Sequence, residues 1–141
     1  MSVGRICTRS VSIGAADESV AVGARRMGEH GVGTLVILDD RQHPVGMLTD
    51  RDVVLRVVAK GLDAASTPIA DVMSRPVVAV RESTPIEDGL ARMAGAPARR
   101  LVVTGDDGRL VGVLALDDVL DLLAEEAQAI GRLLRRTAPS G

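Results

Sequence analysis

The sequence predicts an α+β fold built from two β-α-β-β-α repeats and an extended C-terminal helix. The main observation is an internal duplication: residues 6–57 align without a gap with residues 72–123, an offset of 72 − 6 = 66 positions. The apolar pattern between the identical positions is also the same in both copies. With 46% apolar residues in 141, the chain can form one compact core, or two halves that need each other.

The identical residues of the two copies keep one register along the whole alignment. They are Arg9/Arg75, Val11/Val77, Gly23/Gly89, Arg26/Arg92, Met27/Met93, Leu35/Leu101, Val36/Val102, Asp40/Asp106, Val45/Val111, Gly46/Gly112, Leu48/Leu114, Asp52/Asp118 and Val53/Val119. Chance identities would not keep such a register, so we interpret the chain as a tandem duplication.

Each copy begins with an extended segment, Ser10–Ile13 or Pro76–Val80, and contains two further strands. These later strands are apolar runs joined by turns that are rich in Asp and Gly, so we expect each pair to form a hairpin. The pairs are Thr34–Leu38 with Pro44–Leu48, and Arg100–Thr104 with Leu110–Leu114. A helix then begins near Asp50 in the first copy and near Asp117 in the second.

The first helix of each copy should bury one face. In the second copy it opens with Thr84-Pro85-Ile86-Glu87, where we expect Thr as N-cap, Pro as N1 and Glu as N3. Apolar residues then recur at helical spacing. The residues expected in the core are Val20, Ala24 and Met27 in the first copy, and Ile86, Leu90 and Met93 in the second.

The last helix is expected to run from Asp117 to about Arg136, beyond the end of the repeat. Its apolar positions keep a spacing of three to four throughout, and they are Val119, Leu123, Ala127, Ile130 and Leu134. We expect the face of the last turns to pack on a partner subunit. The predicted boundaries are 3–60 for the first repeat, 61–68 for a linker, 69–124 for the second repeat, 125–136 for the helix extension and 137–141 for a disordered tail.

The composition argues against several classes of partner. The chain has 17 basic and 19 acidic residues and no Phe, Tyr or Trp, so it lacks both a broad basic surface and the usual stacking groups for nucleic acid. Its longest apolar runs are far shorter than the roughly 20 residues of a membrane helix, and no apolar signal segment is visible at the N-terminus. We therefore expect no nucleic-acid partner, no membrane association and a cytoplasmic location.

The few potential metal ligands and nucleophiles are scattered along the chain. Cys7 is the only cysteine, which fits a reducing compartment, and it lies far in sequence from His30 and His43. We expect no metal site, and no histidine lies near a serine or cysteine in the pattern of a catalytic nucleophile. The sequence therefore predicts a protein that is not an enzyme.

A polar motif joins a strand to a helix in each copy. In the first copy it reads Gly46-Met47-Leu48-Thr49-Asp50-Arg51-Asp52, and Thr49 and Asp52 have the spacing of a capping box. In the second copy Ala115 replaces the threonine, although Asp118 remains. Because Asp118 persists where capping by a hydroxyl is lost, we interpret the aspartates as binding residues. The free amides of a helix N-terminus also suit phosphate.

With this motif and the in-register β-α-β-β-α duplication, residues 3 to 123 resemble a tandem pair of CBS domains, also called a Bateman module. The resemblance implies that the two copies pack side by side about a pseudo-twofold axis and form two clefts. It also implies adenine nucleotides or related adenosyl ligands in these clefts, with AMP, ADP, ATP, NAD and S-adenosylmethionine as candidates. No catalytic or transport domain accompanies the pair, so the chain looks like a stand-alone CBS protein that requires no cofactor.

The resemblance also implies roles for individual residues. The motif aspartates, Asp52 and Asp118, would hold ribose hydroxyls, and Thr49 would contact phosphate. Basic residues often face the phosphate just before the next strand of the family fold, here Arg99 and Arg100, although solvated arginines at a strand edge remain the alternative. The positions that match the family's cleft lining are Met47, Val77, Val78, Pro97 and Ala98, for each of which ordinary core packing is the alternative.

The expected function is that of a homodimeric sensor of adenosyl ligands. Its better site should contain Thr49 and Asp52, and the Asp118 cleft should bind phosphorylated ligands less well because it lacks the hydroxyl. The alternative is a ligand-independent dimerisation module that regulates an unidentified partner protein through its long C-terminal helix.

Overall fold

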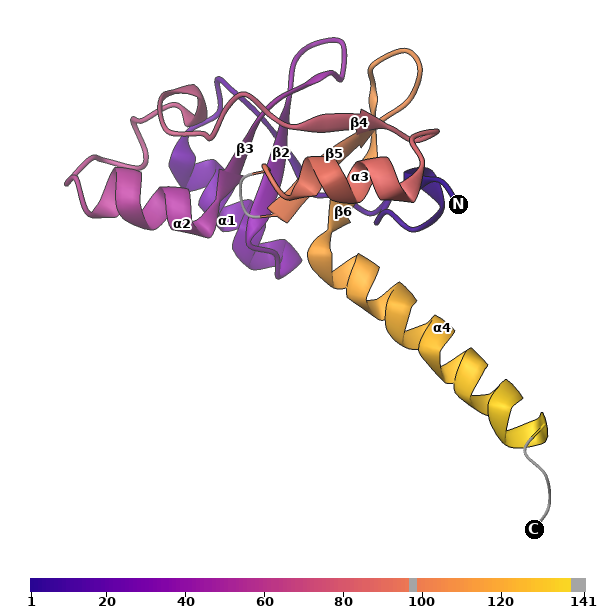
Figure 1. Cartoon of the computed structure of the whole chain (residues 1–141). Coiled ribbons are helices and arrows are strands. Elements are labelled where there is room, and N and C mark those ends of the chain that lie inside the picture. Colours follow the sequence, from indigo (N-terminus) through magenta and orange to yellow (C-terminus); the bar gives the residue numbers. More distant parts are fainter. Residues whose placement is uncertain (97–98, 138–141) are drawn as a thin grey trace.

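The computed structural model describes residues 1–96 and 99–137, which form two three-stranded sheets with helices around them (Figure 1). The first sheet contains β1 (Ile13–Ala15), β2 (Thr34–Leu38) and β3 (Pro44–Thr49), and the second contains β4 (Ala79–Arg81), β5 (Arg100–Thr104) and β6 (Leu110–Ala115). In each sheet the middle strand runs parallel to the first strand and antiparallel to the third. The predicted α+β fold of two repeats is confirmed.

The helices follow the same internal symmetry until the end of the second repeat. They are α1 (Val20–His30) and α3 (Ile86–Met93) after the first strands, and α2 (Asp50–Val53) and α4 (Leu116–Thr137) after the third. The first repeat continues from α2 into a π-helical segment, Val54–Val58. In contrast, α4 has 22 residues and projects away from the rest of the molecule (Figure 1). The predicted helix extension 125–136 is part of α4. The first residue of the predicted tail 137–141, Thr137, is the last residue of this helix, and the other four lie outside the described residues.

Three local predictions were wrong. The first strands begin three residues later than expected, because Ile13 and Ala79 are the first residues in register with β2 and β5. In α3, Pro85 is the N-cap residue in place of Thr84, and no side chain caps the helix. Leu90, which was expected in the core, is 39% exposed.

Glycines, rather than apolar side chains, supply part of the buried face of α1 and α3. A Cβ atom at Gly89 would lie 2.7 Å from Cγ2 of Val3, and one at Gly23 would lie 3.1 Å from Cδ1 of Ile69. Val3 and Ile69 occupy equivalent positions of the two repeats (69 − 3 = 66). Because each glycine lacks a side chain, the first residues of one repeat can approach a helix of the other.

The first residues of each repeat, 3–8 and 69–74, form a crossing segment that packs against the other repeat. Val3 and Gly4 donate backbone hydrogen bonds to the carbonyls of Thr84 and Glu82, and Thr8 pairs with Val113 of β6. The crossing segment of the second repeat makes the equivalent contacts with the first repeat. There the N–H groups of Ile69 and Ala70 donate to Glu18 and Ala16, and Ser74 pairs with Met47 of β3.

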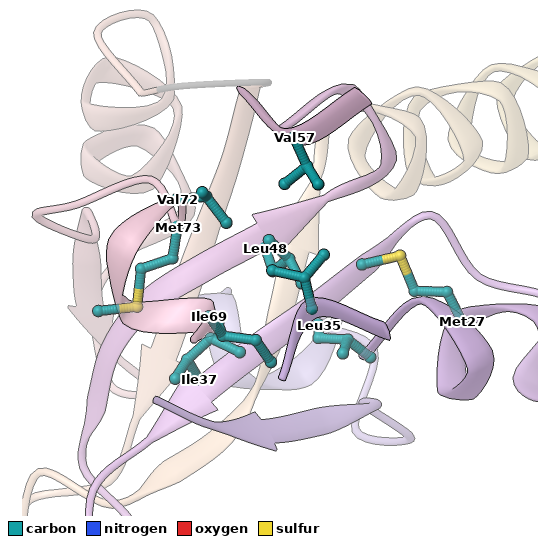
Figure 2. Packing of buried hydrophobic residues seen from close by; sticks show 9 residues of the cluster. Met27, Leu35, Ile37, Leu48, Val57, Ile69, Val72 and Met73 are labelled. Atoms are coloured by element: carbon teal, nitrogen blue, oxygen red, sulfur yellow. The ribbon is translucent and has the colours of Figure 1, made fainter. Parts of the chain in front are cut away.

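The cores contain residues from both repeats because of this exchange. Figure 2 shows the first core, to which the crossing segment contributes three residues; it contains Met27, Leu35, Ile37, Leu48, Val57, Ile69, Val72 and Met73. In the second core Val3 is fully buried among residues of the second repeat. A third cluster joins the sheets through the equivalent residues Val36 and Val102, together with Met47. Neither repeat therefore has a complete core of its own.

One duplicated pair of residues has a structural role that the sequence did not reveal. The guanidinium of Arg26 donates to the carbonyl of Ile13 at 2.9 Å, and that of Arg92 donates to the carbonyl of Ala79 at 3.4 Å. These hydrogen bonds connect α1 to the first residue of β1, and α3 to the first residue of β4. Arg26 also forms a paired contact with Glu18, which lowers the pKa of that carboxyl group.

We predict that Gly112→Ala lowers the free energy of unfolding by about 1–3 kcal/mol, the usual cost of inserting a methyl group where there is no room. Its Cβ would lie 2.5 Å from the backbone oxygen of Thr8, so the crossing segment would have to move. Gly28→Ala in α1 is the control. A Cβ there meets nothing within 4 Å, so this variant should gain about 0.5–1 kcal/mol from helix propensity. Urea unfolding measures both, and equal effects would contradict the crossing contact.

Candidate functional site

The motif of the first repeat forms a complete capping box where β3 meets α2. The N–H of Asp52 donates to Oγ1 of Thr49, and the N–H of Thr49 donates to Oδ2 of Asp52, both at 3.0 Å. Asp52 is only 7% exposed. The two residues proposed for binding therefore also begin the helix.

The carboxylate of Asp52 is further connected to the crossing segment. The hydroxyl of Ser74 donates to its Oδ1 and Oδ2 at 3.0 and 3.1 Å. Nε of Arg56 lies 3.9 Å from Oδ1, while Nη1 of the same arginine donates to the carbonyl oxygens of Val72 (3.0 Å) and Met73 (3.3 Å). Asp52, Ser74 and Arg56 together hold the second repeat's leading segment against the first repeat.

The second repeat keeps half of this arrangement. The N–H of Ala115 donates to Oδ2 of Asp118 at 2.9 Å, so the aspartate still fulfils its part of the capping box without a threonine. The hydroxyl of Thr8, the position equivalent to Ser74 (74 − 8 = 66), donates to Oδ1 of Asp118 at 3.4 Å. The interpretation of Asp118 as a binding residue assumed that its capping role was lost together with the threonine. That assumption was wrong, and the persistence of Asp118 has a structural explanation.

A cavity of about 280 Å³ lies beside the first motif. Its walls come from β3, the start of α2, the crossing segment and β5. The lining residues are Met47, Thr49, Arg51, Asp52, Arg56, Ser74, Pro76, Val77, Val78 and Arg100. We call this space cavity 1. It brings together Thr49, Asp52, Arg100 and three of the apolar residues that the sequence analysis had selected.

A second cavity of about 320 Å³ lies beside the second motif, and we call it cavity 2. Its lining residues are Thr8, Ser10, Val11, Ser12, Val32, Gly33, Thr34, Val36, Arg100, Val113, Ala115, Asp117 and Asp118. Asp118 is thus separated from Asp52 and belongs to the equivalent site of the other repeat, as the duplication predicts. Thr34 contributes a buried hydroxyl oxygen without a hydrogen-bond partner among the described residues.

The two arginines of the Arg99-Arg100 pair lie in different places. Arg100 lines both cavities, whereas Arg99 lies with Leu90, Met93, Ala94 and Leu116 in a separate surface pocket between α3 and α4. Arg99 has a positive φ of 52°, so the chain turns at this residue and consecutive side chains diverge. The other two predicted lining residues, Pro97 and Ala98, lie outside the described residues.

Sequence reasoning missed two further arginines in cavity 1. Arg51 lies inside the motif, between Thr49 and Asp52, and its equivalent in the second copy is Asp117 (117 − 51 = 66). This reversal of charge between equivalent positions is the signal in the sequence by which Arg51 could have been found. Arg56 has Leu122 as its equivalent and reaches the cavity because α2 continues into a π-helical segment.

One histidine lies beside a serine on the surface. Oγ of Ser12 lies 2.8 Å from Nδ1 of His30, on the surface of the first repeat. The two residues are 18 positions apart and meet because α1 packs beside β1. Among the described residues, no three His, Cys, Asp or Glu side chains come together in a way that could hold a metal ion. No helix within the described part of the chain is long and apolar enough to cross a membrane.

A family model for the CBS domain matches residues 3–59 and 69–125. The chain is 35% identical over 118 residues to CBS domain-containing protein YhcV of Bacillus subtilis, with 84% of this chain and 82% of that protein covered. It is 34% identical over 122 residues to an uncharacterised protein of Methanopyrus kandleri, which covers 86% of this chain. The chain spans 62% of the length of that relative.

Solved structures share the fold over most of the chain. CBSX2 of Arabidopsis thaliana in complex with AMP superimposes with a TM-score of 0.75 at 25% identity, covering 89% of this chain and 98% of that one. The CBS domain pair of protein MJ0100, in complex with 5′-methylthioadenosine and S-adenosyl-L-methionine, also has a TM-score of 0.75 and the same coverage. Its 21% identity shows likeness of fold alone.

We predict opposite stability changes for two equivalent substitutions at the motif. Thr49→Ala removes the hydroxyl that accepts the Asp52 N–H and should cost about 0.5–2 kcal/mol of unfolding free energy. Ala115→Thr supplies the missing half of the second capping box and should add about 0.5–1 kcal/mol. Urea unfolding without ligand measures both changes. Destabilisation by Ala115→Thr would show that the second motif cannot form a full box.

Proposed function

The chain belongs to the CBS domain family, and we propose that it is a non-enzymatic regulatory protein that binds an adenine nucleotide or related adenosyl ligand. The proposed binding site is cavity 1. The single observation that carries this proposal is the combination of residues around that cavity: a carboxylate, two hydroxyls, three guanidinium groups and an apolar wall.

The charges of cavity 1 support a ligand that carries phosphate. Arg51, Arg56 and Arg100 contribute three positive charges, and Asp52 contributes one negative charge. Guanidinium groups bind phosphate oxygens through paired hydrogen bonds. In this proposal Thr49 and the arginines hold the phosphate end of the ligand, for which AMP, ADP, ATP and NAD are candidates.

Asp52 and the apolar wall suit the nucleoside part of the same ligand. A carboxylate has about four acceptor positions, and Asp52 uses some of them for the N–H of Thr49 and the hydroxyl of Ser74. The remaining capacity can accept ribose hydroxyls, so capping and binding do not exclude each other. Met47, Val77 and Val78 line the cavity and would enclose adenine in place of aromatic rings, which the chain lacks.

Cavity 2 has the opposite balance of charge. Among the described residues, the charged side chains that line cavity 2 are Asp117, Asp118 and Arg100, and this balance disfavours a ligand with several phosphate charges. We propose Asp118 as a ribose-binding residue of this weaker site, whose ligand carries less negative charge, such as S-adenosylmethionine. A cytoplasmic location, where such ligands occur, is part of the proposal.

We further propose that the protein is a homodimer in which α4 packs against α4 of a second copy. Three apolar residues on this helix, Leu120, Leu123 and Ile130, are 52%, 55% and 59% exposed. The first half of α4 is acidic, with residues such as Asp121 and Glu125, and its last turn carries Arg135 and Arg136. Two copies that run in opposite directions would place acidic residues beside basic ones.

The exposed face of α4 also supports a second candidate function, a ligand-independent dimerisation module that acts on a partner protein. A thermal scan with AMP, ADP, ATP, NAD and S-adenosylmethionine separates the two functions. A ligand at 100 times its dissociation constant should stabilise the protein by ~2.7 kcal/mol. If no ligand of this panel raises the melting temperature, the dimerisation module becomes the better description.

We predict that Asp52→Ala weakens AMP binding roughly 10- to 100-fold, because a charged hydrogen-bond partner contributes about 1.5–3 kcal/mol. Isothermal titration calorimetry measures the change. Asp118→Ala is the matched control, since it removes the equivalent capping contact outside cavity 1. An unchanged dissociation constant in Asp52→Ala, or an equal loss in both variants, would contradict the assignment of the site.

We predict that a chain that ends after Leu123 sediments as a monomer, whereas the full chain sediments as a dimer. The truncation removes Ile130 and the basic last turn of α4, and it leaves both cores intact. Glu125→Arg combined with Glu126→Arg in the full chain provides a second measurement, because it places like charges against the basic turn of the partner. A dimer that persists in both forms would show that α4 is not the interface.

A further inference from the structure

We propose that Arg100 couples the two cavities, so that a phosphate bound in cavity 1 withdraws the one positively charged side chain that the described residues contribute to cavity 2. The inference rests on the proposed function of cavity 1 and concerns how its occupancy regulates the second site. Binding in cavity 1 would make cavity 2 poorer for phosphorylated ligands and better for cationic ones.

The position of Arg100 follows from the pleat of its strand. Arg100 lies two residues before Val102 on β5, so both side chains lie on the same face of the sheet. Val102 is fully buried in the cluster that joins the two sheets, beside its repeat equivalent Val36. Arg100 consequently faces the junction between the repeats, where it lines both cavities.

The duplication supplies no second arginine at this junction. The equivalent of Arg100 is Thr34 (100 − 34 = 66), at the first position of β2. Thr34 lines cavity 2 only, and its buried hydroxyl oxygen has no partner among the described residues. One guanidinium therefore lines two sites.

The side chain of Arg100 is available to either ligand. Within the described part of the chain its guanidinium makes no hydrogen bond or ion pair, in contrast to Arg56, which is held by two carbonyl oxygens. A guanidinium that binds a phosphate in cavity 1 adopts one geometry and cannot form the same contacts in cavity 2.

The coupling has a defined sign for each class of ligand. When Arg100 binds a phosphate in cavity 1, the charged side chains left in cavity 2 are Asp117 and Asp118. A second phosphorylated ligand then meets two carboxylates, whereas a ligand with net positive charge gains from them. Because coupling between binding sites is reciprocal, each ligand must change the affinity of the other by the same factor.

Calorimetric titration with AMP as probe tests the proposal on the full chain and on two variants of Thr34. In the unsubstituted protein the second AMP should bind at least about 10-fold more weakly than the first, the loss expected for one charged hydrogen-bond partner. Thr34→Arg gives cavity 2 a guanidinium of its own and should strengthen the binding of the second AMP by about 10-fold relative to the unsubstituted protein. Thr34→Gln, a long but neutral side chain, should behave like the unsubstituted protein.

The outcomes separate this inference from the proposed function. If AMP does not bind at all, the proposed function of cavity 1 fails, and the coupling fails with it. If AMP binds two equal and independent sites in the unsubstituted protein, or if Thr34→Arg leaves the second site as weak as before, only the coupling is overturned.

A cationic probe provides the second measurement, which does not depend on folding of the Thr34 variants. S-adenosylmethionine carries a sulfonium and an ammonium group against one carboxylate. AMP at a concentration that fills cavity 1 and leaves cavity 2 mostly empty should strengthen its binding by about 3-fold or more in the unsubstituted protein, and Arg100→Ala should abolish this gain. Weaker or unchanged binding of S-adenosylmethionine in the presence of AMP would overturn the coupling.

Discussion

The exchange of leading segments between the two repeats is the constraint on which the rest of the structure depends. Val3 is fully buried in the second core, and Ile69 is fully buried in the first. Backbone hydrogen bonds from Val3 and Ile69 fix each segment against the other repeat. The glycines at equivalent positions of α1 and α3, Gly23 and Gly89, are needed because these segments approach the helices closely.

The candidate sites arise directly from this exchange. Ser74 belongs to a crossing segment, and its hydroxyl donates to Asp52; Thr8 makes the equivalent contact with Asp118. Each cavity is therefore bounded by a motif from one repeat and a segment from the other. A ligand in cavity 1 would contact both halves of the molecule, so binding and the packing of the two repeats are physically linked. That linkage is what a regulatory protein requires.

The duplication made the strands β2, β3, β5 and β6 predictable to within a residue, because apolar runs at a fixed offset leave little freedom. The family resemblance selected Thr49, Asp52, Met47 and Val77 for one cleft, and all four line cavity 1. Sequence reasoning could not find Ser74 or Arg56, since their contacts depend on a crossing segment and on a π-helical turn. Sequence reasoning also assigned Arg99 and Arg100 to the same phosphate site, although the positive φ at Arg99 separates the two side chains.

The exchange also constrains how such a chain could have originated. A single repeat, cut in the linker, would expose the groove that Val3 or Ile69 fills, and its own leading segment would have no acceptor. Two copies of one ancestral repeat could satisfy both needs by swapping these segments, and the ancestor would then fold only as a domain-swapped dimer. Fusion of the two genes would convert an association that depends on concentration into an intramolecular one. It would also allow Arg51 and Asp117, once the same residue, to diverge into sites of opposite charge.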